Sequence, residues 1–473
     1  MNDTSFEQAA KISDERQRRR SLAIKLYNAG VEAANNKINQ QNVDHAYKAF
    51  MDACYADPIY GLAFYQAGNN ESDRNMLAAS VALYRRALEC DNSPQEKAKT
   101  LVNLGWRLHC LGMSEEGHKA SLEAVSLDSS LAYGWLNLSM TSGMLGEQDF
   151  AAECGRKAFM LDPKDPICEM AYAFSLLFNH QFALGLKHFE RRFEYKLTQY
   201  AHYPYPRWSG EPDKTVFLVS DQGMGDTLSY SRFVRQAAKR ANFLHICVQP
   251  ELMRLFAHAF ADLKNINFMP QPGVFPAADY WTTFVSLPFA LGFTDKEIRT
   301  AKNIEAPIYG LPRTWKVPDR KLHIGIAWAG SPLNEIDQHR NIPVHHFFDL
   351  YRVPGIQLYA FQVDGKKDQL HQNGGAALVR DLSGYIRDVV DTISLLQDID
   401  LVICCESALG HIAALAGKEC WIPYSYLGRD YRIGLDGSDR LWTPRHRIFP
   451  QGASRDWGPA FESMIYALKD RMR

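Results

Sequence analysis

The chain contains Thr215-Val216-Phe217-Leu218-Val219-Ser220-Asp221-Gln222-Gly223-Met224-Gly225-Asp226-Thr227, in which an apolar run leads directly into a turn with two glycines. A second apolar run, at residues 401–405, leads into Glu406-Ser407-Ala408-Leu409-Gly410-His411. A short apolar run bounded by turn residues is typical of a buried strand, and open α/β sheets bind ligands at the carboxyl ends of their strands. The two turns therefore predict two facing nucleotide-type domains, with the chemistry at the turns.

Further apolar runs fit two layers of parallel strands connected by crossover helices. The first layer continues with the runs at 243–248 and 280–285, and the second contains those at 322–328 and 356–361. A stretch with three prolines, residues 306–320, links the layers. Short parallel strands with crossover helices are the pattern of a Rossmann-like layer. A cleft between two such layers is the natural site for a nucleotide-bearing ligand.

Four alanines, each followed four residues later by an aspartate, mark an internal repeat before these layers. They are Ala53, Ala87, Ala124 and Ala158, at spacings of 34, 37 and 34 residues. Small residues recur in register at Ala46, Ser80, Gly117 and Ala151 and at Ala34, Gly68, Gly105 and Ser139. A period of 34 residues is that of tetratricopeptide repeats, helical hairpins that stack on one another. A degenerate fifth unit is expected over about residues 166–196.

An array of this kind exposes a concave groove that suits an extended polypeptide. A protein partner is therefore expected in the groove. The alternative is an array that serves only for dimerisation or as a spacer.

Composition excludes several other classes of protein. The 473 residues are 46% apolar and 23% charged, as in a globular protein of two to four domains. A net charge of −1 gives no case for binding nucleic acid or a membrane surface, and the basic run at 16–20 fits a solvated helix face. Nine scattered cysteines suggest neither a zinc site nor a disulfide framework. Because the start lacks a signal-peptide pattern and no run is long enough to cross a membrane, the cytoplasm is the expected location.

Several motifs, in this order, resemble those of bacterial proteins in which tetratricopeptide repeats precede a GT-B glycosyltransferase related to heptosyltransferases and O-linked N-acetylglucosamine transferases. The motifs are Phe189-Glu190-Arg191-Arg192-Phe193, Pro206-Arg207-Trp208-Ser209-Gly210, Gln222-Gly223-Met224-Gly225-Asp226-Thr227, Ser286-Leu287-Pro288, Ile326-Ala327-Trp328-Ala329-Gly330 and the stretch 406–418. The resemblance implies an α-solenoid followed by two Rossmann-like domains. We place the repeat array at 20–199, a linker at 200–214, the acceptor-side domain at 215–305 and the donor-side domain at 321–473.

The resemblance implies that Asp226, in the Gly-Asp turn, is the general base that deprotonates the acceptor hydroxyl. Aspartate is also a favoured N-cap residue, which is the alternative role. Gly223 and Gly225 would let the backbone approach a ligand, with Thr227 completing the loop. The helix beginning near Asp226 would present unpaired amides to an anion.

On the donor side, Glu406 and His411 match an acidic residue and a histidine that contact sugar and phosphate in the family, which usually has Asp at the acidic position. Ser407 and Gly410 would lie with His411 at the start of a helix over 411–416, facing a phosphate. A histidine in the core is the alternative for His411. Arg340 is a second phosphate candidate, with a surface-loop arginine as the alternative. Gln362, just after a strand, is expected to meet the nucleotide base or ribose.

No Asp-x-Asp motif lies near either turn, and the resemblance implies metal-independent, inverting transfer with no cofactor besides the nucleotide-sugar substrate. The leading hypothesis is sugar transfer onto a Ser or Thr hydroxyl of a protein bound by the repeats, with flagellin modification in bacteria as one setting. One alternative is a small-molecule or lipid-linked glycan acceptor. The other is a catalytically silent scaffold. It stays an alternative because Glu406 stands where the family usually has aspartate.

Overall fold

The computed structural model divides the chain into two compact units, Met1–Ser175 and Leu176–Arg473. It describes residues 3–35, 40–90, 92–194, 203–271, 275–310, 313–330, 340–426, 430–432, 445–452 and 454–473. None of the helices in these ranges combines the length and the apolar character needed to cross a bilayer.

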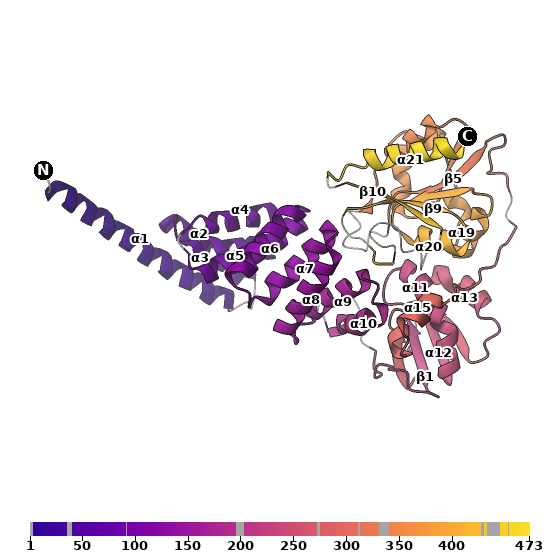
Figure 1. Ribbon diagram of the computed structural model, residues 1–473, viewed down its shortest axis with the longest axis horizontal. Coiled ribbons are helices and arrows are strands. Elements are labelled where there is room, and N and C mark those ends of the chain that lie inside the picture. The colour runs from indigo at the N-terminus through magenta and orange to yellow at the C-terminus, as the bar shows by residue number, and fades with distance from the viewer. Residues whose placement is uncertain are drawn as a thin grey trace. The chain divides into compact units, whose positions relative to one another are not determined.

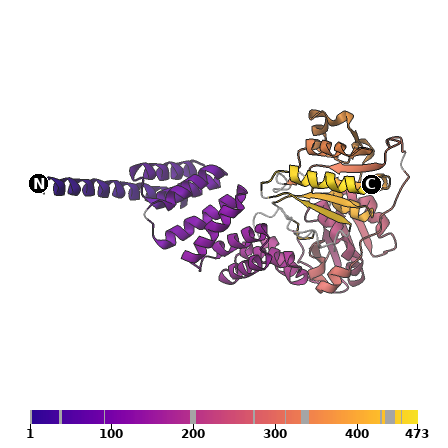
Figure 2. The same cartoon turned by 45° about the horizontal axis from the view of Figure 1, so that its top comes forward.

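The first unit is a row of antiparallel helical hairpins (Figures 1 and 2). Its helices are α1 (Asp3–Asn35), α2 (Gln40–Ala56), α3 (Gly61–Asp73), α4 (Leu77–Leu88), α5 (Pro94–Cys110), α6 (Ser114–Leu127), α7 (Ala132–Leu145), α8 (Gln148–Leu161) and α9 (Pro166–Phe178), the last of which spans the division between the units. Both views show α1 extending well beyond α2, with which it pairs. The predicted helical-repeat region is thus confirmed.

The repeat register read from the sequence matches the packing. The four aligned alanines are all fully buried. At the inter-helix turns, Gly112 and Gly146 have φ values of 72° and 89°, which glycine adopts without strain. A Cβ on Gly117 of α6 would lie 2.8 Å from the carbonyl oxygen of Gly105 on α5. The small residues are therefore needed because the paired helices approach each other so closely.

The second unit begins with a short helical segment and a parallel sheet. Its elements up to the second sheet are α10 (Phe182–Phe189), η1 (Glu190–Glu194), β1 (Thr215–Val219), α11 (Met224–Tyr230), η2 (Ser231–Phe233), α12 (Val234–Arg240), β2 (Phe243–Val248), η3 (Pro250–Leu252), α13 (Met253–Ala259), β3 (Ile266–Pro270), β4 (Tyr280–Thr283), α14 (Leu287–Ala290) and α15 (Asp295–Thr300). The described strands pair in the order β3-β2-β1-β4, all parallel.

A second parallel sheet follows in the same unit. Its elements are β5 (Leu322–Ala327), α17 (His345–Phe348), η4 (Asp349–Arg352), β6 (Ile356–Ala360), η5 (Gly365–Asp368), α18 (Gln369–Gln372), η6 (Gly375–Ala377), β7 (Val379–Asp381), η7 (Ser383–Tyr385), α19 (Val389–Leu396), β8 (Leu401–Cys404), α20 (Ala408–Leu415), β9 (Cys420–Tyr424), β10 (His446–Pro450) and α21 (Gly458–Arg471). The strand order is β10-β9-β8-β5-β6-β7. Counted from the first strand of each sheet, both sheets follow the 3-2-1-4 order of a doubly wound nucleotide-binding sheet.

Both faces of the second sheet are covered. Every residue of β5, β6 and β8 is buried. Alternate residues of these strands pack with α17 and α21 in one apolar core, and Figure 1 shows α21 over one face and α19 and α20 at the other. A parallel sheet covered on both sides reads as continuous apolar runs, which is why the sequence revealed these strands.

The described part of the predicted linker, residues 203–214, packs on the first sheet. Trp208 is 1% exposed, and its backbone amide donates to the carbonyl of Trp281 on β4. The backbone amide of Trp281 in turn donates to the carbonyl of Pro206. This segment therefore extends the edge of the first sheet beside β4.

Candidate functional site

Asp226 lies in the first turn of α11 and faces Arg432, a residue of the second sheet region. The N-cap of α11 is Gly223, and no side chain caps the helix, so the alternative of Asp226 as an ordinary N-cap is wrong. The Asp226 carboxylate instead lies 2.9 Å from Nη1 of Arg432, and the Asp226 side chain is 21% exposed. The carboxylate is thus paired, yet it keeps access to solvent or a ligand.

The two predicted turns meet each other. A Cβ at Gly225 would lie 2.7 Å from Cδ2 of His411, on α20. Ser229, one turn further along α11, shares a 3.1 Å hydrogen bond with Nδ1 of His411. Thr227 is buried, and its hydroxyl donates to Ser220 within the loop. Gly225 therefore serves the close packing of α11 on α20, and Thr227 holds the loop together.

The second turn carries buried polar atoms that lack partners. Glu406 is 6% exposed, and its Oε1 lies 3.6 Å from Nη1 of Arg340. Among the described residues, no hydrogen-bond partner is found for Glu406 Oε2, Ser407 Oγ or Arg340 Nε. Buried polar groups without partners are uncommon because each costs about 1–3 kcal/mol, so such groups call for an explanation. A ligand with hydroxyl and anionic groups would match the hydrogen-bonding capacity of these atoms.

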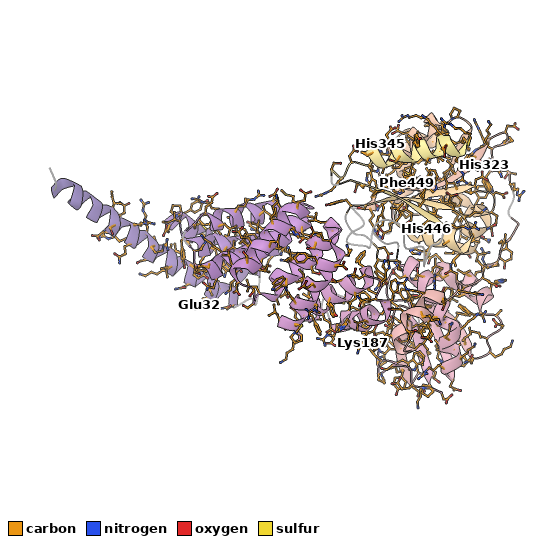
Figure 3. The ribbon with its side chains drawn as sticks, in the orientation of Figure 1. Glu32, Lys187, His323, His345, His446 and Phe449 are labelled. Carbon is orange, nitrogen blue, oxygen red and sulfur yellow. The ribbon has the colours of Figure 1, made fainter. Side chains whose placement is uncertain are left out.

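α20 begins at Ala408, with Ser407 as its N-cap, so the predicted helix start at His411 is corrected by three residues. His411 consequently lies in the first turn of α20 and contacts α11. The carbonyl of Gly410 accepts a hydrogen bond from Nε2 of His446 on β10, a residue labelled in Figure 3. Gly410 and His411 are therefore engaged with protein groups, and their predicted contacts with phosphate stay predictions.

Burial sets the protonation of this cluster. It raises the pKa of Asp226, against the lowering effect of Arg432. Burial, with the negative charge of Asp430, raises the pKa of Glu406 to about 8. Burial and the positive charge of Arg432 lower the pKa of His411 to about 3. Near neutral pH, Glu406 is thus a hydrogen-bond donor and His411 is a neutral imidazole without positive charge.

The sequence analysis did not identify the segment Asp430-Tyr431-Arg432, which completes the cluster. Arg432 is 7% exposed and pairs with Asp430 through Nε at 2.9 Å as well as with Asp226. The hydroxyl of Tyr431 hydrogen-bonds to that of Tyr230 on α11. The segment follows β9, a strand that the sequence analysis also did not identify. No pattern in the sequence therefore indicated that this segment lies at the carboxyl edge of the sheet.

Gln362 has every polar side-chain atom satisfied by the protein. Its Oε1 accepts from the backbone amides of Trp328 and Ala329, and its Nε2 donates to the Ala329 carbonyl and to Asp364. It therefore fixes the segment that follows β5. Contact with a nucleotide base or ribose would require one of these bonds to break, and that contact stays a prediction.

A second buried network brings together residues from two of the quoted motifs and Asp221, which directly precedes a third. Arg192 is 1% exposed and bonds Asp221 at 2.9 Å, Thr283 at 2.9 Å and Ser286 at 2.7 Å. Glu190 accepts from both Arg192 and Ser286. The network holds the loop after β1 against the end of β4, at the position where strand order reverses. Arg192 was missed as a site residue because its partners are remote in sequence.

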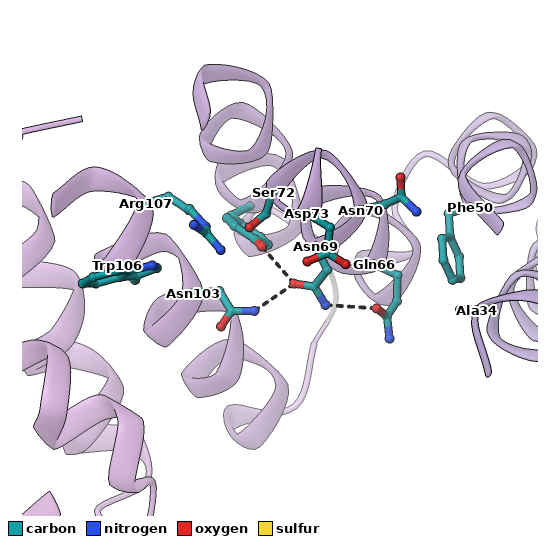
Figure 4. Close-up of a pocket in the computed structure, with 11 residues that line it drawn as sticks. Ala34, Phe50, Gln66, Asn69, Asn70, Ser72, Asp73, Asn103, Trp106 and Arg107 are labelled. Atoms are coloured by element: carbon teal, nitrogen blue, oxygen red, sulfur yellow. Dashed lines mark hydrogen bonds between the residues drawn. The ribbon is translucent and has the colours of Figure 1, made fainter. Parts of the chain in front are cut away.

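The first unit has a groove of about 390 Å³ lined by helices α1 to α5 (Figure 4). Its floor carries amide side chains: Asn103 donates to Asn69 at 2.8 Å, and Asn69 donates to Gln66 at 3.0 Å. Asn70 adds a buried Oδ1 for which the described residues supply no partner. Trp106 and Arg107 line the same groove. Amides that both donate and accept match the needs of a polypeptide backbone.

No family model matches the chain, and no curated protein matches it. Solved structures that resemble part of it include YrrB, described as a TPR protein with an unusual peptide-binding site, at 17% identity over 39% of this chain and 89% of that one, with a TM-score of 0.31. PilF of Pseudomonas aeruginosa has 21% identity over 37% and 76%, and MamA of Desulfovibrio magneticus RS-1 has 14% over 38% and 97%, both with a TM-score of 0.31.

Proposed function

We propose that the chain is an inverting, metal-independent GT-B glycosyltransferase that moves a sugar from a nucleotide-sugar onto a Ser or Thr hydroxyl of a protein acceptor. The support for a nucleotide-type ligand is the order of the two parallel sheets. Each sheet has its switch point beside its first strand, and the turns at 221–227 and 406–411 lie at the carboxyl ends of strands there. Ligands of doubly wound sheets bind at this position.

The observation that carries the proposal is the group of buried unpartnered atoms on Glu406, Ser407 and Arg340. A protonated Glu406 and the Ser407 hydroxyl would bond sugar hydroxyls, and the Arg340 guanidinium would bond phosphate. Asp226, which approaches the same cluster from the other sheet, would accept the proton of the acceptor hydroxyl. Each step of an inverting transfer thus has a candidate group: donor binding, leaving-group stabilisation and proton removal.

A polypeptide acceptor is favoured by the amide-lined groove of the first unit. Its volume falls within the range of ordinary ligand sites, and Asn69, Asn70 and Asn103 offer donors and acceptors to an extended backbone. The repeats would then select the acceptor, while the second unit performs the chemistry. A glycan acceptor would leave the groove without a role in catalysis.

The test is transfer of labelled sugar by the full-length chain to polypeptides, with modified Ser or Thr residues identified by mass spectrometry. Labelling that is lost in Asp226→Asn supports the proposal. Asn103→Ala separates the acceptors, because it should lower protein labelling while leaving donor hydrolysis unchanged. Asn267→Ala, on β3 and not among the residues that line the groove, is the matched control. Labelling of glycan alone would identify the small-molecule or lipid-linked alternative, and the absence of any transfer would favour the silent scaffold.

A further inference from the structure

Arg432 contacts two carboxylates in different ways, through hydrogen bonds to Asp430 and through an ion pair with Asp226. Asp430, two residues earlier, accepts from Arg432 Nε and Nη2, so the guanidinium is anchored within its own segment. Nη1 faces Asp226 Oδ1 at 2.9 Å, but this contact lacks hydrogen-bond geometry, and Nη1 has no hydrogen-bond partner among the described residues. The contact with Asp226 is therefore an ion pair that leaves the donors of Nη1 unused.

The cluster around Arg432 is rich in carboxyl groups. Its carboxyl groups are Asp226, Asp430 and Glu406, of which Glu406 is protonated near neutral pH. The guanidinium groups that contact them in the described part of the cluster are those of Arg340 and Arg432. An anionic ligand held at Glu406 and Ser407 would be repelled by the carboxylates of Asp226 and Asp430 unless a guanidinium turned toward it. Arg340 is one guanidinium placed to do this, and Arg432, whose Nη1 has no hydrogen-bond partner among the described residues, is the other.

We propose that Arg432 is a phosphate-binding residue that exchanges its ion pair with Asp226 for a phosphate oxygen of the ligand, and so frees Asp226 when the ligand binds. This inference rests on the proposed function and deepens it, because it names how donor binding activates the base. A carboxylate paired with a guanidinium is a weaker proton acceptor than the same carboxylate alone. The exchange would therefore prevent Asp226 from taking a proton before the donor is in place.

Other charged groups also act on Asp226. Asp430 and Glu406 approach from the second sheet region and Asp221 from the loop after β1, while His411 on α20 is neutral near pH 7. The negative charges of Asp430 and Asp221 favour the protonated form of Asp226, whereas Arg432 favours the ionised form. Loss of Arg432 from the pair therefore increases the basicity of Asp226, as the proposal needs.

The test is calorimetric titration of the full-length chain with inorganic pyrophosphate. Arg432→Gln should weaken binding about 10-fold or more, because a charge-assisted hydrogen bond is lost. Asp226→Asn should tighten binding by about 10-fold, because the competing carboxylate is removed. In the double variant the gain from Asp226→Asn should vanish. Arg432→Lys, which keeps the charge, covers the case in which Arg432→Gln does not fold, and Arg235→Gln at an exposed ion pair is the control.

Unchanged or weaker pyrophosphate binding in Asp226→Asn would overturn the proposal. The same holds if Asp226→Asn tightens binding equally when Arg432→Gln is also present, or if the wild-type chain binds no pyrophosphate. The proposed function can fail separately. Competition between Asp226 and pyrophosphate without sugar transfer would leave the phosphate site standing and remove the transferase. Sugar transfer that is unaffected by Arg432→Gln would support the transferase and rule out the proposed role of Arg432.

Discussion

Gly225 and His411 pack against each other so closely that a Cβ at position 225 would lie 2.7 Å from the His411 ring. The two residues come from α11 and α20, whose turns were the first ligand-site candidates in the sequence. His411 is further fixed by its hydrogen bond to Ser229. This contact joins the two sheet regions at the place where Asp226 and Glu406 are proposed to act.

Gly225→Ala should destabilise the second unit by about 1–3 kcal/mol, because the added methyl group forces the His411 ring or α11 to move. Gly223→Ala is the matched control. A Cβ there would meet only Asp226 Oδ2, at an ordinary 3.4 Å, and the φ of Gly223 is −65°. Urea unfolding of both variants measures the difference. Equal stability of the two would show that the close contact with His411 does not constrain position 225.

Asp226→Asn should lower sugar transfer by about 100-fold to 10,000-fold, the usual contribution of a general base, without loss of folding. The amide keeps the shape of the carboxylate but cannot take the proton. The rate is measured as release of nucleotide at saturating donor and acceptor. Asp262→Asn, in an exposed ion pair with Arg235, is the control and should retain full activity. Full turnover by Asp226→Asn would eliminate Asp226 as the base.

Glu406→Gln should make the stability of the chain less sensitive to pH between about 4.5 and 8. The folded state keeps the Glu406 proton up to a pKa of about 8, whereas the ordinary value is 4.5. Since the folded state binds more protons in this range, its free energy of unfolding falls as pH rises. The variant lacks this loss, so its advantage over wild type should grow by roughly 3–4 kcal/mol from pH 5 to 8.

Thermal unfolding of the full-length chain at a series of pH values gives this comparison. Glu462→Gln serves as the control, because Glu462 lies exposed in an ion pair with Arg352 and should give no such growing advantage. A constant difference between Glu406→Gln and wild type across the range would mean that Glu406 is ionised in the folded state.

In the repeat array, Gly117→Ala should destabilise by about 1–3 kcal/mol, because its Cβ would lie 2.8 Å from the backbone carbonyl of Gly105. Gly143→Ala makes a contrasting variant in α7. Its nearest neighbour would be 3.8 Å away, so the gain in helix propensity should stabilise the array by about 0.5–1 kcal/mol. Helical circular dichroism during denaturation follows both. Similar changes in the two variants would show that the inter-helix spacing does not restrict position 117.

Much of the fold was predictable from local pattern. β1, β2, β5, β6 and β8 are short apolar runs because both faces of their sheets are covered, and the repeat alanines recur because each hairpin packs in the same way. β3 and β10 were not identified. β3 has no buried residue, β10 has only His446 and Phe449 buried, and β10 begins with His446-Arg447, so neither forms an apolar run.

The site was only partly predictable. Its two turns carry glycine and acidic residues in a local pattern, so the turns could be predicted from the sequence. The pairing of Asp226 with Arg432 depends instead on how the two sheet regions pack, which no local spacing encodes. For the same reason the protonated state of Glu406 could not be foreseen, because it depends on burial beside Asp430.

The central claim is that the unpartnered groups of Glu406, Ser407 and Arg340 bind a nucleotide-sugar. Calorimetric titration of the full-length chain with UDP-, GDP-, ADP-, dTDP- and CMP-sugars tests it most directly, with Arg340→Gln titrated alongside. We predict saturable binding of one nucleotide class, weakened at least about 10-fold in Arg340→Gln through loss of a charge-assisted hydrogen bond. Binding of no nucleotide-sugar, or equal binding by the variant, would contradict the account.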